Sequence, residues 1–262
     1  MKRIALILAF ALLATVAVVA QDKPKQEAPK PDAAKAEAKP AAGAPTVDEI
    51  LGKNLKAVGG KEAIEKFTSR AMKGAFEIEA MNMTGAIEIL SKAPNKSWVM
   101  VNIPGFGVVN NVFDGTKAWS ADPAQGLREL SGAELAQMKR RSDFYSEANL
   151  KKHYTKMEVK GKEKVGASEA WVIEGTPAEG SPEKLYFDVN TSLLVRQDVE
   201  AEGPQGKMMT ESYLEDYKVV DGIKIAHTMK QVTPMFAMTM KFTEVKHNVE
   251  IDDAKFGKPA GN

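Results

Sequence analysis

From Met72 onward, apolar and polar residues alternate over most of the chain, and this period of two constrains the fold more than any other feature. In the first such run, Phe76 and Ile78 fall on one side and Glu77 on the other. That pattern is typical of a strand with one face buried and one face in water. We therefore expect strands, and not helices, to build most of the core.

Short turn sequences divide the alternating region into about eleven strands. The clearest are Pro104-Gly105-Phe106-Gly107, Asp114-Gly115 and Asp221-Gly222. Tight turns join neighbouring antiparallel strands, and no regular strand–helix–strand alternation runs through the chain. The expected class is mainly β (α+β), with a single large curved antiparallel sheet forming an open half-barrel. We expect Gly85 to break the first run, and residues 153–165 and 235–248 to be strands.

Helical periodicity is confined to short stretches, which predict two or three helices on the concave side of the sheet. Thr46-Val47-Asp48-Glu49 has the capping-box pattern and starts a helix that Gly59-Gly60 ends. A short second helix is expected at about 61–67. Ser131-Gly132-Ala133-Glu134 repeats the capping-box pattern and predicts a helix that runs to about Leu150.

The N-terminus has the pattern of an export signal. Lys2 and Arg3 precede residues 4–20, which carry no charge and end in small residues, so we expect a signal peptide at 1–20, cleaved near Ala20. An uncleaved membrane anchor is the alternative. Residues 21–45 are rich in Pro, Ala and Lys and predict a disordered linker, which leaves one β domain at 46–262.

The composition offers no sign of catalysis or of a bound cofactor. The formal net charge is +1, which gives no general attraction for nucleic acid. The chain has no Cys, and His153, His227 and His247 lie far apart in the sequence and outside any nucleophile motif. We therefore expect neither an enzyme nor catalytic residues, and neither a metal nor a cofactor.

Methionine is the unusual residue, with 13 in the chain and most of them in the predicted strands. Methionine fills irregular cores, and it also lines surfaces that fit variable apolar partners, so both interpretations stay open. The last strand favours the second, because its apolar residues form a stripe on one face of a curved sheet that short helices fill only in part. The candidate residues for a hydrophobic cavity are Phe76, Ile78, Met100, Trp119, Met138, Phe236, Met238, Met240 and Phe242.

The order of elements resembles the outer-membrane lipoprotein-sorting family, the periplasmic lipoprotein carriers and their relatives. The resemblance spans about 46–259. It rests on Val58-Gly59-Gly60 after the first helix, Phe113-Asp114-Gly115-Thr116-Lys117-Ala118-Trp119, Lys184-Leu185-Tyr186-Phe187-Asp188, Asp216-Tyr217-Lys218-Val219-Val220-Asp221-Gly222-Ile223-Lys224, and the closing residues 244–256.

The resemblance implies a periplasmic protein that holds lipid or lipoprotein acyl chains in a half-barrel. It implies an acylated lipoprotein or a lipid as the partner, together with inner- or outer-membrane envelope proteins. Relatives of this fold also suggest an alternative, an envelope protein-interaction or stress-sensor module with no transported ligand. In the carriers a buried Arg gates the lid, whereas residues 72–100 here contain no Arg. The resemblance therefore implies a hydrophobic ligand but leaves its identity open.

Overall fold

The computed structural model describes residues 43–203 and 206–260. The predicted signal peptide and nearly all of the predicted linker lie outside these residues. Within the described ranges, no helix combines the length and the apolar character needed to cross a membrane.

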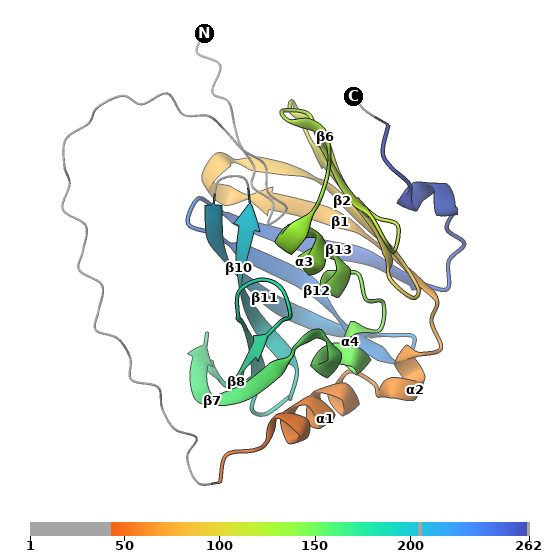
Figure 1. Ribbon diagram of the computed structural model, residues 1–262. Coiled ribbons are helices and arrows are strands. Elements are labelled where there is room, and N and C mark those ends of the chain that lie inside the picture. Colours follow the sequence, from red (N-terminus) through yellow and green to blue (C-terminus); the bar gives the residue numbers. More distant parts are fainter. Residues whose placement is uncertain (1–42, 204–205, 261–262) are drawn as a thin grey trace, which may run out of the picture.

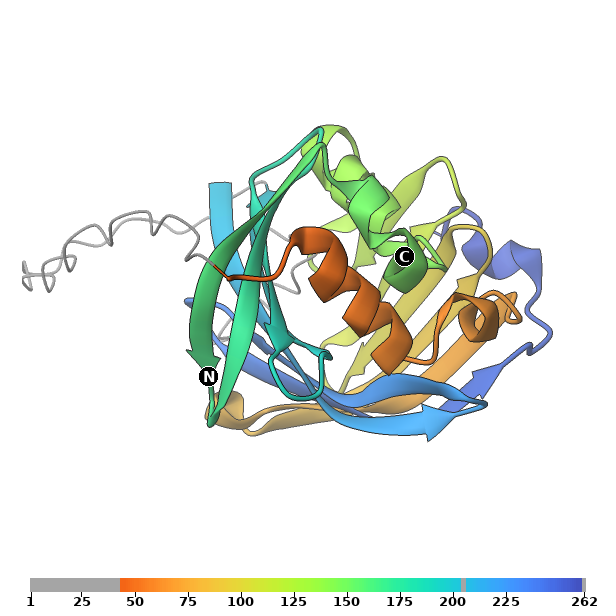
Figure 2. The ribbon, with the colours of Figure 1, turned by 90° about the horizontal axis from the view of Figure 1, so that it is seen from below.

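A single antiparallel sheet of 13 strands is the main element of the described residues (Figure 1). The strands are β1 (Ser69–Ile78), β2 (Met83–Lys92), β3 (Lys96–Ile103), β4 (Gly107–Phe113), β5 (Ala118–Asp122), β6 (Gly126–Glu129), β7 (Lys156–Val165), β8 (Ser168–Thr176), β9 (Glu183–Asp188), β10 (Leu194–Gly203), β11 (Gly206–Val220), β12 (Ile223–Val232) and β13 (Ala237–His247). The sheet is strongly curved and open, which confirms the mainly β, half-barrel prediction with two strands more than expected (Figure 2).

The strand order places the first and last strands side by side in the middle of the sheet. It runs β6-β5-β4-β3-β2-β1-β13-β12-β11-β10-β9-β8-β7, so β1 pairs with β13 and all other neighbours are consecutive in the chain. The sheet therefore has two walls, β2 to β6 and β7 to β12, that meet at the β1–β13 pair. Every pairing is antiparallel, as the tight turns predict.

In the part of the chain that the structure describes, four α-helices lie on the concave side, between the two walls (Figure 2). They are α1 (Val47–Ala57), α2 (Lys61–Ile64), α3 (Gly132–Arg141) and α4 (Ser146–Asn149). The capping box of α1 is confirmed: Thr46 Oγ1 accepts from the Glu49 N–H at 3.2 Å, and Glu49 Oε2 accepts from the Thr46 N–H at 2.7 Å. Helix α2 is shorter than predicted and ends at Ile64.

The prediction of the third helix is wrong in two respects, its N-terminal cap and its C-terminal end. Ser131 is the N-cap residue of α3, but its side chain makes no capping bond, because Glu134 turns instead to Arg128 on β6. The helix also ends at Arg141 and not near Leu150. Ser142 and Asp143 follow it, and their side chains bond to Ser97 and to the Tyr145 N–H, in competition with a continued helix.

The sequence predicted that Gly85 breaks the first strand run, and this prediction is wrong. Gly85 lies inside β2, and the break is the 3-10 helix η1 (Glu79–Met81), which Asn82 ends in the left-handed region at φ 46°. Gly85 instead stands opposite Phe76, where a Cβ atom would lie 2.6 Å from Phe76 Cε1. The missing side chain is therefore what lets the Phe76 ring lie over the neighbouring strand.

Two strand boundaries also differ from the prediction. His153 belongs to the 3-10 helix η2 (Leu150–His153), and β7 begins only at Lys156. Strand β13 begins at Ala237, because Thr233 Oγ1 accepts from the N–H groups of Met235 and Phe236 and holds them in a turn. The C-terminal segment after β13 covers the convex face, where Ile251 and Phe256 pack on Leu90.

Candidate functional site

The concave side of the sheet carries an apolar cluster rich in methionine and phenylalanine, called here the Met/Phe cluster. Its buried members are Phe76, Ile78, Ile87, Val101, Ile103, Val109, Phe236, Met238, Met240 and Phe242. Partly buried around them are Met72, Met81, Met83, Ile89, Val99, Phe106, Met208, Met229 and Val245. The set contains seven methionines and, within the described part of the chain, no residue of the four α-helices.

Strand register brings this cluster together from distant parts of the sequence. Phe76 on β1 pairs with Met240 on β13, and Met240 pairs with Met229 on β12. Since paired residues point to the same face, the stripe predicted for the last strand continues across three strands. The sequence shows each stripe singly, but their meeting depends on the pairing of the first strand with the last.

Six of the nine predicted cavity residues lie in the Met/Phe cluster. They are Phe76, Ile78, Phe236, Met238, Met240 and Phe242. A seventh, Met138, is on α3 and packs with Phe113, Ala118 and Leu130 in a separate concave cluster.

Met100 and Trp119 lie on the opposite face of the sheet from the other seven predicted residues. Met100 directly precedes Val101, which points inward, and Trp119 directly follows Ala118, which also points inward. Successive side chains of a strand point to opposite faces, so both belong to the convex side. An apolar side chain alone does not show on which face of a strand it lies, so the sequence did not separate these two residues from the others.

Helix α3 spans the concave side between the two walls. Leu135 and Met138 contact the β4–β5 wall through Phe113 and Ala118. At its end, Arg140 Nη2 donates to Glu183 Oε1 on β9 at 2.7 Å, and Arg140 Nη1 donates to the carbonyl oxygen of Glu179 at 3.1 Å. The helix is therefore held at one end by apolar packing and at the other by a charge-assisted contact.

Glu183 is the centre of a buried polar cluster on the concave side. Its Oε2 accepts from the Tyr154 hydroxyl at 2.8 Å and from Gln197 Nε2 at 3.1 Å, in addition to the Arg140 contact. Burial, and then the negative charge of Glu183, raise the pKa of Tyr154 above its ordinary value. Tyr154 therefore stays protonated and acts as a donor to the carboxylate.

A row of polar side chains leads from Glu183 along the sheet to the Met/Phe cluster. The register pairs Gln197 with Ser212, Ser212 with Gln231, and Gln231 with Met238. All three polar residues are half-buried. They share the concave face with Met238, so polar and apolar surfaces adjoin there.

Arg70 is a concave residue that the sequence prediction placed outside the sheet. Strand β1 begins at Ser69, three residues before the expected start at Met72, so Arg70 lies within it. Its Nε donates to His247 Nε2 at 3.2 Å, and its guanidinium lies 5.5 Å from the ring centroid of Phe144, in the segment between α3 and α4. The first strand therefore does supply an arginine that contacts the helical side.

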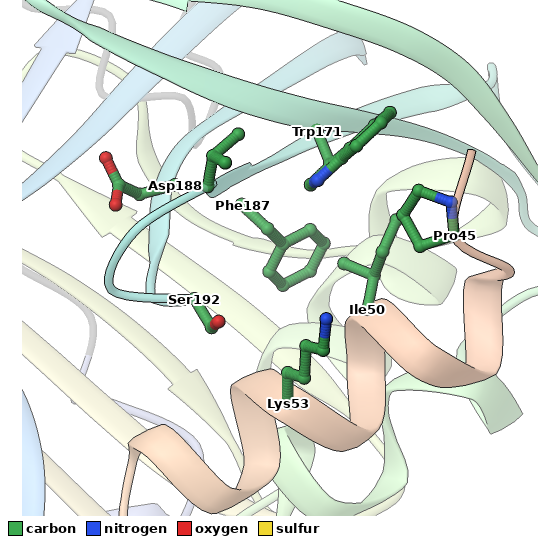
Figure 3. A pocket seen from close by; sticks show the side chains of 8 residues that line it. Pro45, Ile50, Lys53, Trp171, Phe187, Asp188 and Ser192 are labelled. Carbon is green, nitrogen blue, oxygen red and sulfur yellow. The ribbon is translucent and has the colours of Figure 1, made fainter. Parts of the chain in front are cut away.

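A second candidate site lies between α1 and the β8–β9 hairpin (Figure 3). It is a small pocket, partly open to solvent, with a cavity volume of about 30 Å³. Its lining consists of Pro45, Ile50, Lys53, Trp171, Phe187, Asp188, Val189 and Ser192. No pattern in the sequence pointed to it, because its members come from three separate segments.

Asp188 at this pocket is engaged in the turn after β9. Burial opposes its charge, but the N–H and hydroxyl groups of Thr191 and the N–H of Asn190 hold the pKa of the carboxyl below its ordinary value. The carboxylate therefore organises the turn that forms one side of the pocket.

The three histidines occupy unrelated places. His153 Nε2 lies 2.8 Å from Asp143 Oδ2, His227 Nδ1 lies 2.9 Å from the Ile225 carbonyl oxygen, and His247 Nδ1 lies 2.9 Å from Asp221 Oδ2. Among the residues that the structure describes, no group of three or more His, Cys, Asp or Glu side chains could hold a metal ion.

Comparison with solved structures relates this architecture to known proteins. A DUF1329-family protein from Desulfovibrio piger superposes with a TM-score of 0.55 and 14% identity, over 80% of this chain and 97% of the other. A LolA-superfamily protein from Nitrosomonas europaea superposes with a TM-score of 0.54 and 14% identity, over 82% and 99%. The chain has the fold of the LolA superfamily.

The likeness extends over most of the chain, since the two superpositions cover 80% and 82% of it. No protein-family model and no curated protein sequence matches the chain, so the likeness is one of structure.

Proposed function

We propose that this protein is an envelope binding or carrier protein that holds lipid or lipoprotein acyl chains on the concave face of its half-barrel. The observation that carries the proposal is the Met/Phe cluster. Methionine is flexible and polarisable, so a surface rich in it adapts to apolar partners of different shapes. The partly exposed members of the cluster, such as Met208 and Met229, would be the first to touch such a ligand.

The N-terminal sequence supports a periplasmic location for the protein. A signal peptide at 1–20 would export the chain, and the linker at 21–45 would separate the processing site from the domain. A periplasmic protein with this fold could meet the lipids or lipoproteins of either membrane. The LolA-like fold supports this periplasmic location, and the sequence resemblance to periplasmic lipoprotein carriers agrees with it.

An interaction or sensor module is the alternative, and the edges of the open sheet do not favour it. The edge strand β7 carries Lys and Glu along most of its length, and the edge strand β6 has only 4 residues. Charged and short edges resist the addition of a further strand. A protein partner that binds by strand pairing would therefore find no suitable edge.

Binding of a fluorescent acyl probe tests the proposal. Adjacent residues on β11 provide a matched pair of variants, since Met208 belongs to the Met/Phe cluster and Met209 points away and is 46% exposed. We expect Met208→Gln to weaken probe binding and Met209→Gln to leave it unchanged. Native mass spectrometry of the purified protein should also detect bound lipid. If the purified protein carries no lipid and binds no probe, the proposal is refuted.

A further inference from the structure

Exposed apolar side chains gather at one end of the half-barrel. Among the residues that the structure describes, four large apolar side chains are exposed, and three of them lie near this end: Val108 at 39%, Met235 at 53% and Met209. The fourth, Val219 at 67%, is at the other end of β11. Single exposed apolar side chains are common, whereas a group of them marks a surface that contacts another molecule.

Strand register brings three turns together at this end. The turns and the strand residues next to them, called here the rim, are residues 79–83, 103–109 and 232–237. They join six strands that are neighbours in the sheet, in the order β4-β3-β2-β1-β13-β12. Asn102 pairs with Ala86 near the start of β2, and Glu77 pairs with Thr239 near the start of β13, so the turns lie at nearly the same level. At about 4.8 Å between strands the rim is about 24 Å long.

The rim presents apolar side chains and almost no charge. Glu79 is its one charged residue, and it contains neither Lys nor Arg. Pro104 and Pro234 are exposed in the same turns as Phe106 and Met235. An anionic surface would therefore find no cation here, and attraction to the rim has to come from apolar contact. Helices α1 and α2 lie at the other end of the half-barrel and leave these turns uncovered (Figure 1).

Each of the three turns also reaches the Met/Phe cluster. Met81 and Phe106 pack on the cluster from their turns, and Phe236 is one of its buried members. The exposed side chains of the rim and the apolar side chains of the concave face therefore belong to the same short segments. An acyl chain that enters the half-barrel past the rim would meet the Met/Phe cluster next.

The shape of the rim favours a lipid surface over a protein as its partner. The rim consists of separate turns at the ends of strands, and a protein interface needs a partner whose shape and hydrogen bonds are complementary to it. A fluid lipid layer accommodates separate apolar protrusions without such complementarity. Binding to it grows with the apolar area that leaves water.

We propose that the rim docks this protein on the surface of a lipid bilayer, with Val108 and Met235 inserted among the lipids. The inference extends the proposed function, because it names the end of the half-barrel at which acyl chains enter and leave. Docking should need no anionic lipid, since the rim has no basic residue.

Co-sedimentation with phosphatidylcholine vesicles tests the inference, on the protein as purified from the soluble part of the cell envelope. We expect the native protein to bind these vesicles. Val108→Gln/Met235→Gln should bind about tenfold more weakly, because two apolar side chains no longer enter the lipid. Val219→Gln is the matched control, since it removes the same kind of exposed side chain at the other end of the sheet, and it should bind as the native protein does. Circular dichroism checks that all variants fold.

Two conditions separate apolar docking from electrostatic binding. Higher salt, or phosphatidylglycerol in place of part of the phosphatidylcholine, should change binding by less than about twofold. Binding that requires phosphatidylglycerol and is lost at high salt would overturn the inference. Equal vesicle binding by the native protein and Val108→Gln/Met235→Gln would also overturn it.

The fluorescent acyl probe distinguishes docking from ligand binding. Val108→Gln/Met235→Gln should take up the probe as the native protein does, because it retains Met208 and Met229 of the Met/Phe cluster. A native protein that binds the probe but no vesicles overturns the inference and leaves the proposed function standing. If sedimentation equilibrium shows a dimer that Val108→Gln/Met235→Gln dissociates, the rim binds a second copy of the chain and the inference is wrong. Failure to bind both probe and vesicles would remove the proposed function as well.

Discussion

Arg140 on α3 and Glu183 on β9 form the contact that ties the helix to the far wall of the half-barrel. The Nη2–Oε1 distance is 2.7 Å, and the two side chains are 16% and 5% exposed. The same carboxylate also binds Tyr154 and Gln197. Loss of Arg140 would remove the charged donor in direct contact with this carboxylate and leave it the hydrogen bonds from Tyr154 and Gln197.

Arg140→Met should therefore destabilise the protein by about 3 kcal/mol, as expected when one partner of a buried ion pair is removed. Lys151→Met is the control, because its ion pair with Asp48 is 63% and 72% exposed and should contribute less than about 1 kcal/mol. Urea unfolding of both variants measures the difference. Equal losses of stability would contradict the buried character of the Arg140 contact.

Gly85 and Gly52 should respond to alanine in opposite directions. At Gly85 a Cβ atom would collide with Asn102 of β3 and with the Phe76 ring, so Gly85→Ala should cost several kcal/mol, on the order of 3. At Gly52, inside α1, nothing lies within 4 Å, and Gly52→Ala should stabilise by about 0.5–1 kcal/mol. Thermal unfolding should show a lower melting temperature for Gly85→Ala and a higher one for Gly52→Ala than for the native protein. An unchanged melting temperature in Gly85→Ala would contradict the close strand packing at Gly85.

Local patterns predict a large share of this fold because the physics behind them is local. Alternation along each strand, the tight turn at Asp114-Gly115 and the capping box of Thr46 and Glu49 depend only on neighbouring residues. The same capping-box pattern at Ser131 fails because Glu134 has a stronger partner in Arg128, which belongs to another strand. Local rules hold until a tertiary contact competes with them.

The candidate site was harder to predict, since it depends on long-range contacts. Arg140 and Glu183 are 43 residues apart, and no spacing rule connects them. The Met/Phe cluster required the pairing of β1 with β13, which follows from topology and not from either strand. The face of Met100 could be predicted only relative to its neighbours, and Val101 next to it is the residue that points inward.

Asn111 presents a buried amide whose replacement should stabilise the protein. Its side chain is fully buried on β4, and neither amide atom has a hydrogen-bond partner within the described chain. Asn111→Leu removes two unsatisfied polar atoms at similar volume and should add about 1–3 kcal/mol of stability. In contrast, Asn54 is also buried but donates to the Ser192 carbonyl oxygen at 2.9 Å, so Asn54→Leu should destabilise. Chemical denaturation compares the two, and a loss of stability in Asn111→Leu would show that the amide is in fact satisfied.

His247 should make the stability of the protein depend on pH in the weakly acidic range. Its Nε2 accepts from Arg70 and its Nδ1 faces Asp221, an arrangement that requires the neutral ring with its proton on Nδ1. Burial lowers the pKa of His247 below its ordinary value of 6.5, and the charge of Arg70 lowers it further, against the opposing effect of Asp221. The unfolded chain therefore binds a proton at a higher pH than the folded chain. Stability should be full above about pH 6.5 and fall as the pH drops from there to the folded pKa.

Two measurements check this dependence. An NMR titration should give a His247 midpoint below 6.5 in the native protein and a higher midpoint in Arg70→Met, because that substitution removes the nearby positive charge. Urea unfolding at a series of pH values should show a steeper decline in the native protein than in His247→Gln, which cannot take up the proton. A midpoint at or above 6.5 in the native protein would contradict the neutral ring, and with it the hydrogen bond from Arg70 that links β1 to the end of β13.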